Sequence, residues 1–396
     1  MSGSRISSWF LKLSLCGVVH AVGMVLGGVL VRLMGLEPMP LPAGVDPFAQ
    51  FALSVLGGMV IAIGLASMAV SLSARQWQRW AILTAFAFIA NGVAVALETS
   101  IFLTLGGDVA LATATLPASA LCALAVVWCF PVRHDDRGTQ PQHIIFSRWT
   151  TTELLFRIAA ALIAFPLIYL LFGAAIAPVV RPVYSQIEFL VIPSGTTIFT
   201  MQILRSTLFF LISIPVALKW CGTRRALAVS LGLAHFACVG LNGLIQTPFF
   251  PVAMRLAHGA EVFADSFAYA LVFAWLFGPV KPDTDAKRRG ESRTSITILR
   301  VAGVLTAIAC IAAVGSRPFA YYLAVRVLVS CVAGAGVVVS VRRGGSRWAW
   351  VLGGLIVVFN PVFPFPLSRE LWQIADLTAA ATLLVWQYVI ARRQPG

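Results

Sequence analysis

The chain has 396 residues, of which 59% are hydrophobic and only 11% are charged, and its formal net charge is +14. Soluble domains carry about 25% charged residues, so the composition excludes an ordinary soluble protein and indicates a polytopic membrane protein. The basic residues separate apolar runs instead of forming one patch, which argues against nucleic acid as a partner. The seven cysteines lie mostly in apolar segments without paired spacing, so neither a disulfide framework nor a zinc site is expected.

Twelve segments are long and apolar enough to cross the bilayer as helices, which takes ~20 residues for ~30 Å of hydrocarbon. The sequence therefore predicts an all-α fold, a transmembrane bundle of about 12 spans. The segments are 13–34, 48–73, 80–104, 109–130, 151–176, 197–219, 226–246, 259–279, 296–315, 319–341, 347–365 and 368–391. The first is too long for the apolar region of a signal peptide and is predicted to be an uncleaved span.

The distribution of Lys and Arg predicts the orientation of this bundle. Of the 29 basic residues, 20 lie in the two termini and the even-numbered loops, and four lie in the odd-numbered loops. Cytoplasmic loops are enriched in Lys and Arg, so both termini are predicted to be cytoplasmic. The expected location is the inner (plasma) membrane, with the lipid bilayer as the main partner.

The charged stretch 281–293 divides the chain into an eight-span membrane domain (1–280) and a four-span C-terminal module (294–396). It is predicted to be a cytoplasmic linker. The longest external loop, 178–196, contains Tyr, Phe and Ile, and it is predicted to be an interfacial or re-entrant segment. We find no internal sequence repeat of the kind that marks duplicated transporters.

The last quarter of the chain carries a specific motif, NPVFPFPLSRELWQIAD at 360–376, preceded by Tyr321, Tyr322 and Arg326. Over residues 319–391 it resembles a family of small bacterial integral membrane proteins known only as a domain of unknown function. The resemblance implies a membrane fold and no activity. Four residues of the motif are predicted to have structural roles where the chain breaks between two helices: Asn360, Pro361, Arg369 and Glu370. The front part of the chain resembles other uncharacterised bacterial multi-span proteins.

Polar residues of several spans share one depth, ~0–12 Å from the outer boundary by helical rise. Each would carry a large energetic penalty in lipid, so each must face protein or water. We predict that they line a polar cavity open to the outside: Glu98, Gln202, Arg205, His258, Glu261, Asp265 and Asp376.

Arg205 is the expected anchor for an anionic group, because a guanidinium stays charged and binds phosphate or carboxylate in a fork. Either Glu98 or Asp265 is expected to be its counter-ion, and either is a candidate proton carrier. A purely structural ion pair between Glu98 and Arg205 is the alternative. His258, Glu261 and Asp265 share one helix face, but three ligands on one helix are weak evidence, so no metal and no cofactor are predicted.

Three classes of function remain open. The preferred one is a transporter-like protein for a small or lipid-related anionic solute. The second is a membrane-embedded enzyme acting on a lipid-linked substrate at the outer leaflet, although the first external loop lacks the expected pair of carboxylates. The third is a non-catalytic component of a membrane assembly. The sequence identifies neither the solute nor catalytic residues, and it does not predict the oligomeric state.

Overall fold

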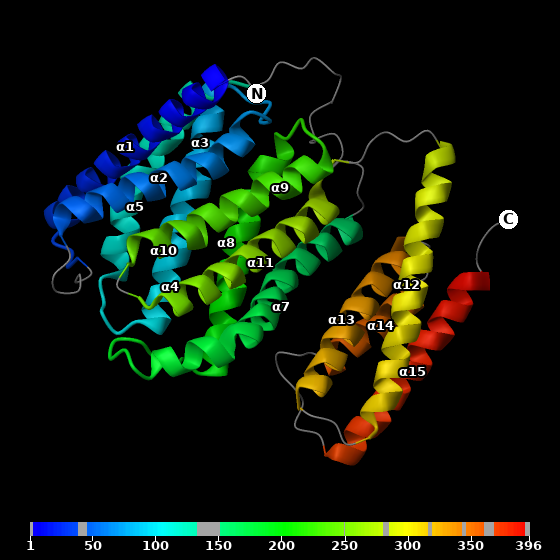
Figure 1. Cartoon of the computed structure of the whole chain (residues 1–396). Coiled ribbons are helices and arrows are strands. Elements are labelled where there is room, and N and C mark those ends of the chain that lie inside the picture. The colour runs from blue at the N-terminus through cyan, green and yellow to red at the C-terminus, as the bar shows by residue number, and fades with distance from the viewer. Residues whose placement is uncertain are drawn as a thin grey trace. The chain divides into compact units, whose positions relative to one another are not determined.

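The computed structural model of the chain describes residues 3–38, 46–132, 151–248, 250–279, 285–315, 319–342, 346–359 and 368–392. The chain divides into two compact units, Met1–Val280 and Lys281–Gly396, and each is considered by itself. The described residues are helical apart from turns, connecting segments and two isolated β-bridges (Figure 1). The predicted all-α fold is therefore confirmed.

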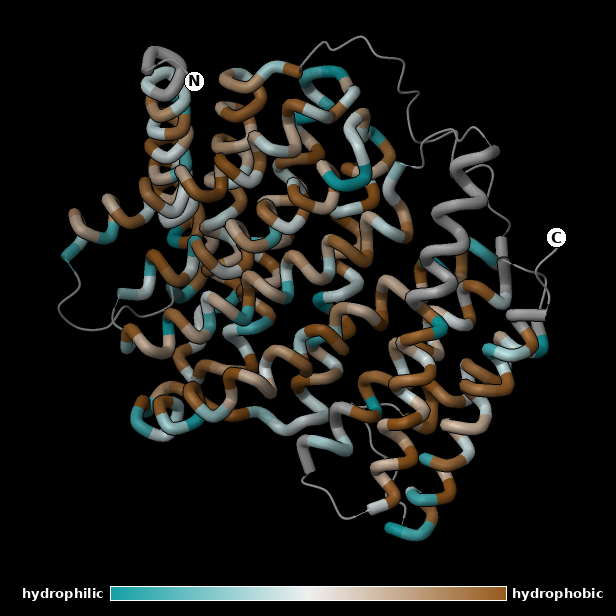
Figure 2. The backbone as a smooth tube through the Cα atoms, turned by 45° about the vertical axis from the view of Figure 1, so that its right-hand side comes forward, coloured by the Kyte–Doolittle hydropathy of each residue, from teal (hydrophilic) through white to brown (hydrophobic). Residues whose placement is uncertain are grey.

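The described part of the first unit contains eight helical segments that are long and apolar enough to cross a membrane. Two of these segments are interrupted by π-helices, η1 and η2. The elements are α1 (Gly3–Leu33), α2 (Pro47–Ala69), α3 (Gln76–Ala87), η1 (Phe88–Val93), α4 (Ala94–Phe102), α5 (Asp108–Cys129), α7 (Thr151–Tyr184), α8 (Gly195–Leu218), α9 (Arg224–His235), η2 (Phe236–Leu241), α10 (Asn242–Gln246) and α11 (Val252–Phe277). Hydrophobic residues predominate along them, and hydrophilic residues gather mostly at their ends (Figure 2).

The second unit contains α12 (Asp285–Ala313), α13 (Phe319–Arg342), α14 (Ser346–Val358) and α15 (Arg369–Arg392). Three of these include shorter apolar stretches, Leu299–Ala313, Val325–Val337 and Arg347–Val358. The structure thus has eight helices of spanning length among its described residues, and the other four spans stay a prediction. α12 begins inside the segment assigned to a linker, whose alanine, lysine, arginine and glutamate residues favour helix.

The segment predicted to be an interfacial loop is partly helical, because α7 continues through Pro178 and Pro182 as far as Tyr184. The chain then packs on the end of α4 instead of lying free. Leu190 forms an antiparallel bridge with Leu103, and the Val191 amide donates to the Phe102 carbonyl at 2.9 Å. This connection closes one end of the first unit beside the end of α4.

The two halves of the first unit repeat the same elements at a constant interval of 148 residues, which the sequence analysis did not detect. The interval separates the first residues of α2 and α8, of α3 and α9, and of η1 and η2, and also the last residues of α5 and α11. The packing repeats as well, since α1 contacts α2 and α5 as α7 contacts α8 and α11. The first unit is therefore an internal structural repeat of a four-helix bundle.

A bridge between the halves shows that a pseudo-two-fold axis relates them. Leu72 pairs in antiparallel fashion with Trp220, which is its own equivalent 148 residues later. A residue can face its own equivalent only on a two-fold axis. η1 also contacts η2, as expected for elements next to that axis. Sequence identity at the 148-residue interval is confined to a few positions, such as Phe88 with Phe236 and Gly92 with Gly240, which explains why the repeat was missed.

The third span of each half packs on the fourth span of its own half and also on the second span of the other half. α10 of the second half packs on α2 of the first, and α4 of the first half packs on α8 of the second. Figure 1 shows α9 and α10 running alongside α2. Each half is therefore completed by a helix end from the other half.

The first half is more tightly packed because glycines let its helices approach. A Cβ added at Gly27 of α1 would overlap the Ala114 carbonyl oxygen of α5, and one at Gly23 would overlap the backbone of Ala118. Small residues permit such close contact between membrane helices. The second half has Leu171 and Ala175 at the equivalent positions, so α7 and α11 lack the pair of glycines.

This packing predicts the effect of Gly27→Ala. The new methyl group collides with helix backbone, which cannot rotate away, so we expect a destabilisation of ~1–3 kcal/mol, typical of overpacking. Thermal unfolding of the purified protein in detergent measures it. Gly28→Ala is the matched control, because a Cβ at Gly28 has nothing within 4 Å. Equal stability of the two variants would contradict the close approach of α1 and α5.

The alternating directions of the helices give a second prediction. Reporter fusions after Arg75 and Arg225 should be cytoplasmic, because Lys and Arg accumulate at that end of the first unit, and fusions after Asp108 and Arg255 should be external. Reporters active on only one side of the membrane measure this. A single reversed reporter among the four contradicts the predicted orientation.

Candidate functional site

Arg205 is the centre of a buried polar cluster in the first unit. It lies on α8 and is only 2% exposed. Its Nη1 atom is 3.0 Å from Glu98 Oε1 and donates to Gln202 Oε1 at 3.3 Å. Gln202 and Arg205 are one helical turn apart, so their side chains lie on the same face of α8. Glu98 comes from α4, so the ion pair joins the two halves of the unit.

Aromatic rings surround the guanidinium on its other sides. Its Cζ atom lies 5.6 Å from the ring centroid of Phe209 on α8, and 5.8 and 6.0 Å from those of Phe165 and Tyr169 on α7. An arginine within about 6 Å of aromatic faces is stabilised by cation–π attraction. These rings keep the buried charge away from lipid.

A second polar pair lies on α11. His258 Nδ1 is 2.7 Å from Glu261 Oε2, as expected for residues three apart on a helix. The Glu261 side chain is 4% exposed and the His258 side chain 34%. Gly173 of α7 gives the carboxylate room, since a Cβ there would lie 3.1 Å from Glu261 Oε1. His258 is therefore the exposed edge of the cluster.

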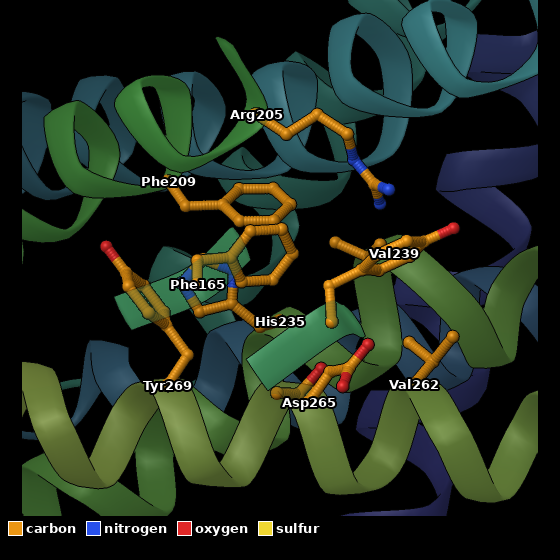
Figure 3. Close-up of a pocket in the computed structure, with 10 residues that line it drawn as sticks. Phe165, Arg205, Phe209, His235, Val239, Val262, Asp265 and Tyr269 are labelled. Carbon is orange, nitrogen blue, oxygen red and sulfur yellow. The ribbon is translucent and has the colours of Figure 1, made fainter. Parts of the chain in front are cut away.

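Asp265 faces a small cavity between α8 and α11. In Figure 3, Arg205 and Asp265 enter the cavity from opposite sides, with Phe165, Phe209 and Tyr269 beside them. The volume open to the centres of water molecules is about 20 Å³, which is room for about one water. Its lining residues are Phe165, Tyr169, Arg205, Phe209, His235, Val239, Val262, Asp265, Ser266 and Tyr269.

Asp265 lies within electrostatic range of the other ionisable residues of the cluster: Glu98, Arg205, His258 and Glu261. The structure thus brings together six of the seven residues that the sequence analysis selected, from α4, α8 and α11. Tyr169, Phe165 and Phe209 were not among the predicted site residues, because aromatic residues in an apolar span look like ordinary core. His235 is also on the cavity, and its Nε2 is 3.2 Å from Ser213 Oγ.

The seventh residue, Asp376, belongs to the second unit. There it is 4% exposed and interacts electrostatically with Arg326, whose guanidinium lies 4.2 Å from the centroid of the Trp372 ring. Arg369 and Glu370 are exposed at the start of α15. Asn360 and Pro361 lie outside the described residues.

The pseudo-two-fold equivalent of this cluster is neutral. The 148-residue interval pairs Glu98 with Gln246, Arg205 with Gly57 and Gln202 with Ser54. Ser54 and Gln246 belong to a chain of hydrogen bonds that runs between the halves, from α2 through α10 to η1. Ser54 Oγ donates to Gln246 Oε1 at 3.1 Å, Gln246 Nε2 to Asn242 Oδ1 at 2.7 Å, and Asn242 Nδ2 to Asn91 Oδ1 at 2.8 Å.

This amide chain predicts that Asn242→Ala destabilises the protein. The substitution leaves Asn91 Oδ1 and Gln246 Nε2 without these hydrogen bonds, and a buried unsatisfied polar group costs ~1–3 kcal/mol. Thermal unfolding in detergent measures the loss. Thr247→Val is the control, because the Thr247 hydroxyl donates only to the Gly243 carbonyl of its own helix turn, at 2.9 Å. Equal effects of the two changes would contradict the proposed importance of the amide chain.

Comparisons with known proteins add little to this picture. In the described residues, no three His, Cys, Asp or Glu side chains are arranged to hold a metal ion. No curated protein and no solved structure matches the chain. A family model described as a family of unknown function, DUF6804, matches residues 298–388. The second unit of the chain is therefore similar to a family whose function is itself unknown.

Proposed function

We propose that this is a multi-pass protein of the inner (plasma) membrane that binds a small or lipid-related anionic solute at Arg205, as a transporter does. The observation that carries the proposal is the unused hydrogen-bonding capacity of a buried guanidinium. Both polar contacts of Arg205 use Nη1, and its buried Nε atom has no partner. Gln202 Nε2 is a second buried donor without a partner.

These two donors favour an anion as the ligand. Arginine binds carboxylate or phosphate through two parallel hydrogen bonds, which needs Nε and one terminal nitrogen, or both terminal nitrogens. An anionic group that bonds to Nε would satisfy the unpartnered donor without displacing Glu98 from Nη1. Gln202, one turn away, would add a third hydrogen bond.

The small size of the cavity indicates that the proposed binding site is closed to solutes in this structure. A space for about one water holds no solute larger than an ion. Binding then requires that α7 and its connection to α8 move away from the end of α4. The bridge between Leu103 and Leu190 is the contact that would open. His258, already a third exposed, lies at the entrance.

The orientation of the chain supports an opening to the outside. The cluster lies towards the ends of α4 and α10 and the starts of α8 and α11, opposite the basic loops that follow α2 and α8. By the positive-inside rule, the basic loops are cytoplasmic and the cluster is in the outer half.

The test is anion binding by Arg205→Lys. Lysine keeps the charge but loses the fork, so we expect anion affinity to fall about tenfold or more, since one charge-assisted hydrogen bond contributes ~1.5–3 kcal/mol. Ligand-dependent thermal stabilisation of the protein in lipid nanodiscs measures it. The probes are inorganic phosphate, acetate and a short-chain phosphatidate, which separate free anions from lipid headgroups.

Arg181→Lys is the matched control, because Arg181 is exposed at the end of α7. It should bind like the unmodified protein. The proposal is wrong if none of the probes stabilises the unmodified protein, or if the Arg205 variant is stabilised to the same extent.

A further inference from the structure

The cluster around Arg205 contains more negative than positive groups. Its carboxylates are Glu98, Glu261 and Asp265, and its basic side chains are Arg205 and His258. Even with His258 protonated, ionisation of all three carboxylates would leave a net negative charge in a largely buried site. Burial of an unpaired charge is strongly unfavourable, and such a group is neutralised instead.

The contacts identify which carboxylate is in excess. Glu98 is paired with Arg205 at 3.0 Å, and Glu261 is paired with His258 at 2.7 Å. Asp265 is 4% exposed, and its Oδ1 atom has no hydrogen-bond partner. The sequence left Glu98 and Asp265 as alternative counter-ions of Arg205, and the structure gives that role to Glu98.

The groups that face Asp265 offer it no other positive partner. His235 of α9 is bonded to Ser213 through Nε2 and is enclosed by aromatic rings, with the centroids of Phe86 and Phe209 each 4.9 Å away. The titratable and charged groups that line the cavity or interact electrostatically with Asp265 are Glu98 of α4, Tyr169 of α7, Arg205 of α8, His235 of α9, and His258, Glu261 and Tyr269 of α11.

We propose that Asp265 is a proton-binding site and that it is protonated while Arg205 is paired with Glu98. Release of the proton breaks the O–H bond, leaves the electron pair on the carboxylate and transfers the proton to a water molecule, for which the cavity has room. Arg205 lines the same cavity from the opposite side. Its guanidinium stabilises the ionised Asp265 when it turns away from Glu98.

The proton also has a role in the proposed function, and this part of the inference rests on it. An anion that binds Arg205 adds negative charge to a cluster that already has an excess. With Asp265 protonated, a bound monovalent anion leaves the cluster with one net negative charge, and with Asp265 ionised it leaves two. The proton on Asp265 therefore favours anion binding, so anion and proton are bound together and would be carried in the same direction.

The experiment is infrared spectroscopy of the purified protein in nanodiscs, without any added anion. At neutral pH we expect a carbonyl-stretch band of a protonated carboxylic acid, which shifts when the protein is produced with carbon-13-labelled aspartate. The band should be absent in Asp265→Asn. Asp108→Asn is the control and should keep it, because Asp108 accepts a hydrogen bond from Thr99 at 2.6 Å outside the cluster.

Glu98→Gln tests the switch. It removes the partner of Arg205, so the guanidinium is free to stabilise ionised Asp265, and the band at neutral pH should fall at least about twofold. If Asp265→Asn does not fold, Asp265→Glu replaces it, and the band should then lose its sensitivity to labelled aspartate.

The proposal is overturned if the unmodified protein has no protonated carboxyl band, or if the band survives in Asp265→Asn. It is also overturned if Glu98→Gln leaves the band unchanged. None of these measurements uses an anion, so a failure of anion binding at Arg205 and a failure of proton binding at Asp265 are separately visible.

Discussion

The ion pair between Arg205 and Glu98 is the constraint on which the arrangement of the first unit depends. A guanidinium that is almost completely buried needs a counter-charge. The second half of the unit contributes two carboxylates to the cluster, Glu261 and Asp265 on α11. Glu98 instead reaches Arg205 from the first half. Loss of one partner of a buried ion pair is strongly destabilising. The packing of α4 on α8 therefore has two effects. It holds the two halves together at the cluster, and it brings the carboxylate that neutralises Arg205.

The two π-helices help to place the polar residues that follow them. A π-helical turn contains one residue more than the α-helical register, so it rotates every later side chain about the helix axis, and such turns are frequent at functional sites. η1 precedes Glu98 and η2 precedes Gln246, at the same interval in the repeat. Gly92 and Gly240 let these turns pack closely on α5 and α11, since a Cβ at either would overlap a side chain there.

Much of this could be predicted from the sequence, because the bilayer imposes simple rules. Apolar length gave the eight helices of the first unit to within a few residues at most ends, and the energetic penalty of charge in lipid selected Glu98, Arg205 and Asp265 for one site. Three features could not be predicted. The repeat survives mainly as spacing, and the aromatic residues around Arg205 resemble those of any core. The helical extent of α7 also escaped prediction, because Pro178 and Pro182 normally indicate a loop.

The internal repeat of the first unit has a consequence for how such a chain can evolve. In the first unit, a helix end of each half packs on the other half. This is the arrangement of a symmetric dimer whose two subunits are joined into one polypeptide. In a dimer of identical subunits, each change at one site is copied into the other, so both must remain the same. Covalent linkage removes that obligation. One of the two equivalent positions of this chain holds Arg205 and Glu98. Its counterpart has Gly57 and Gln246 and carries only uncharged side chains that hydrogen-bond to one another. The charged cluster therefore occupies only one of two positions that the internal symmetry makes equivalent.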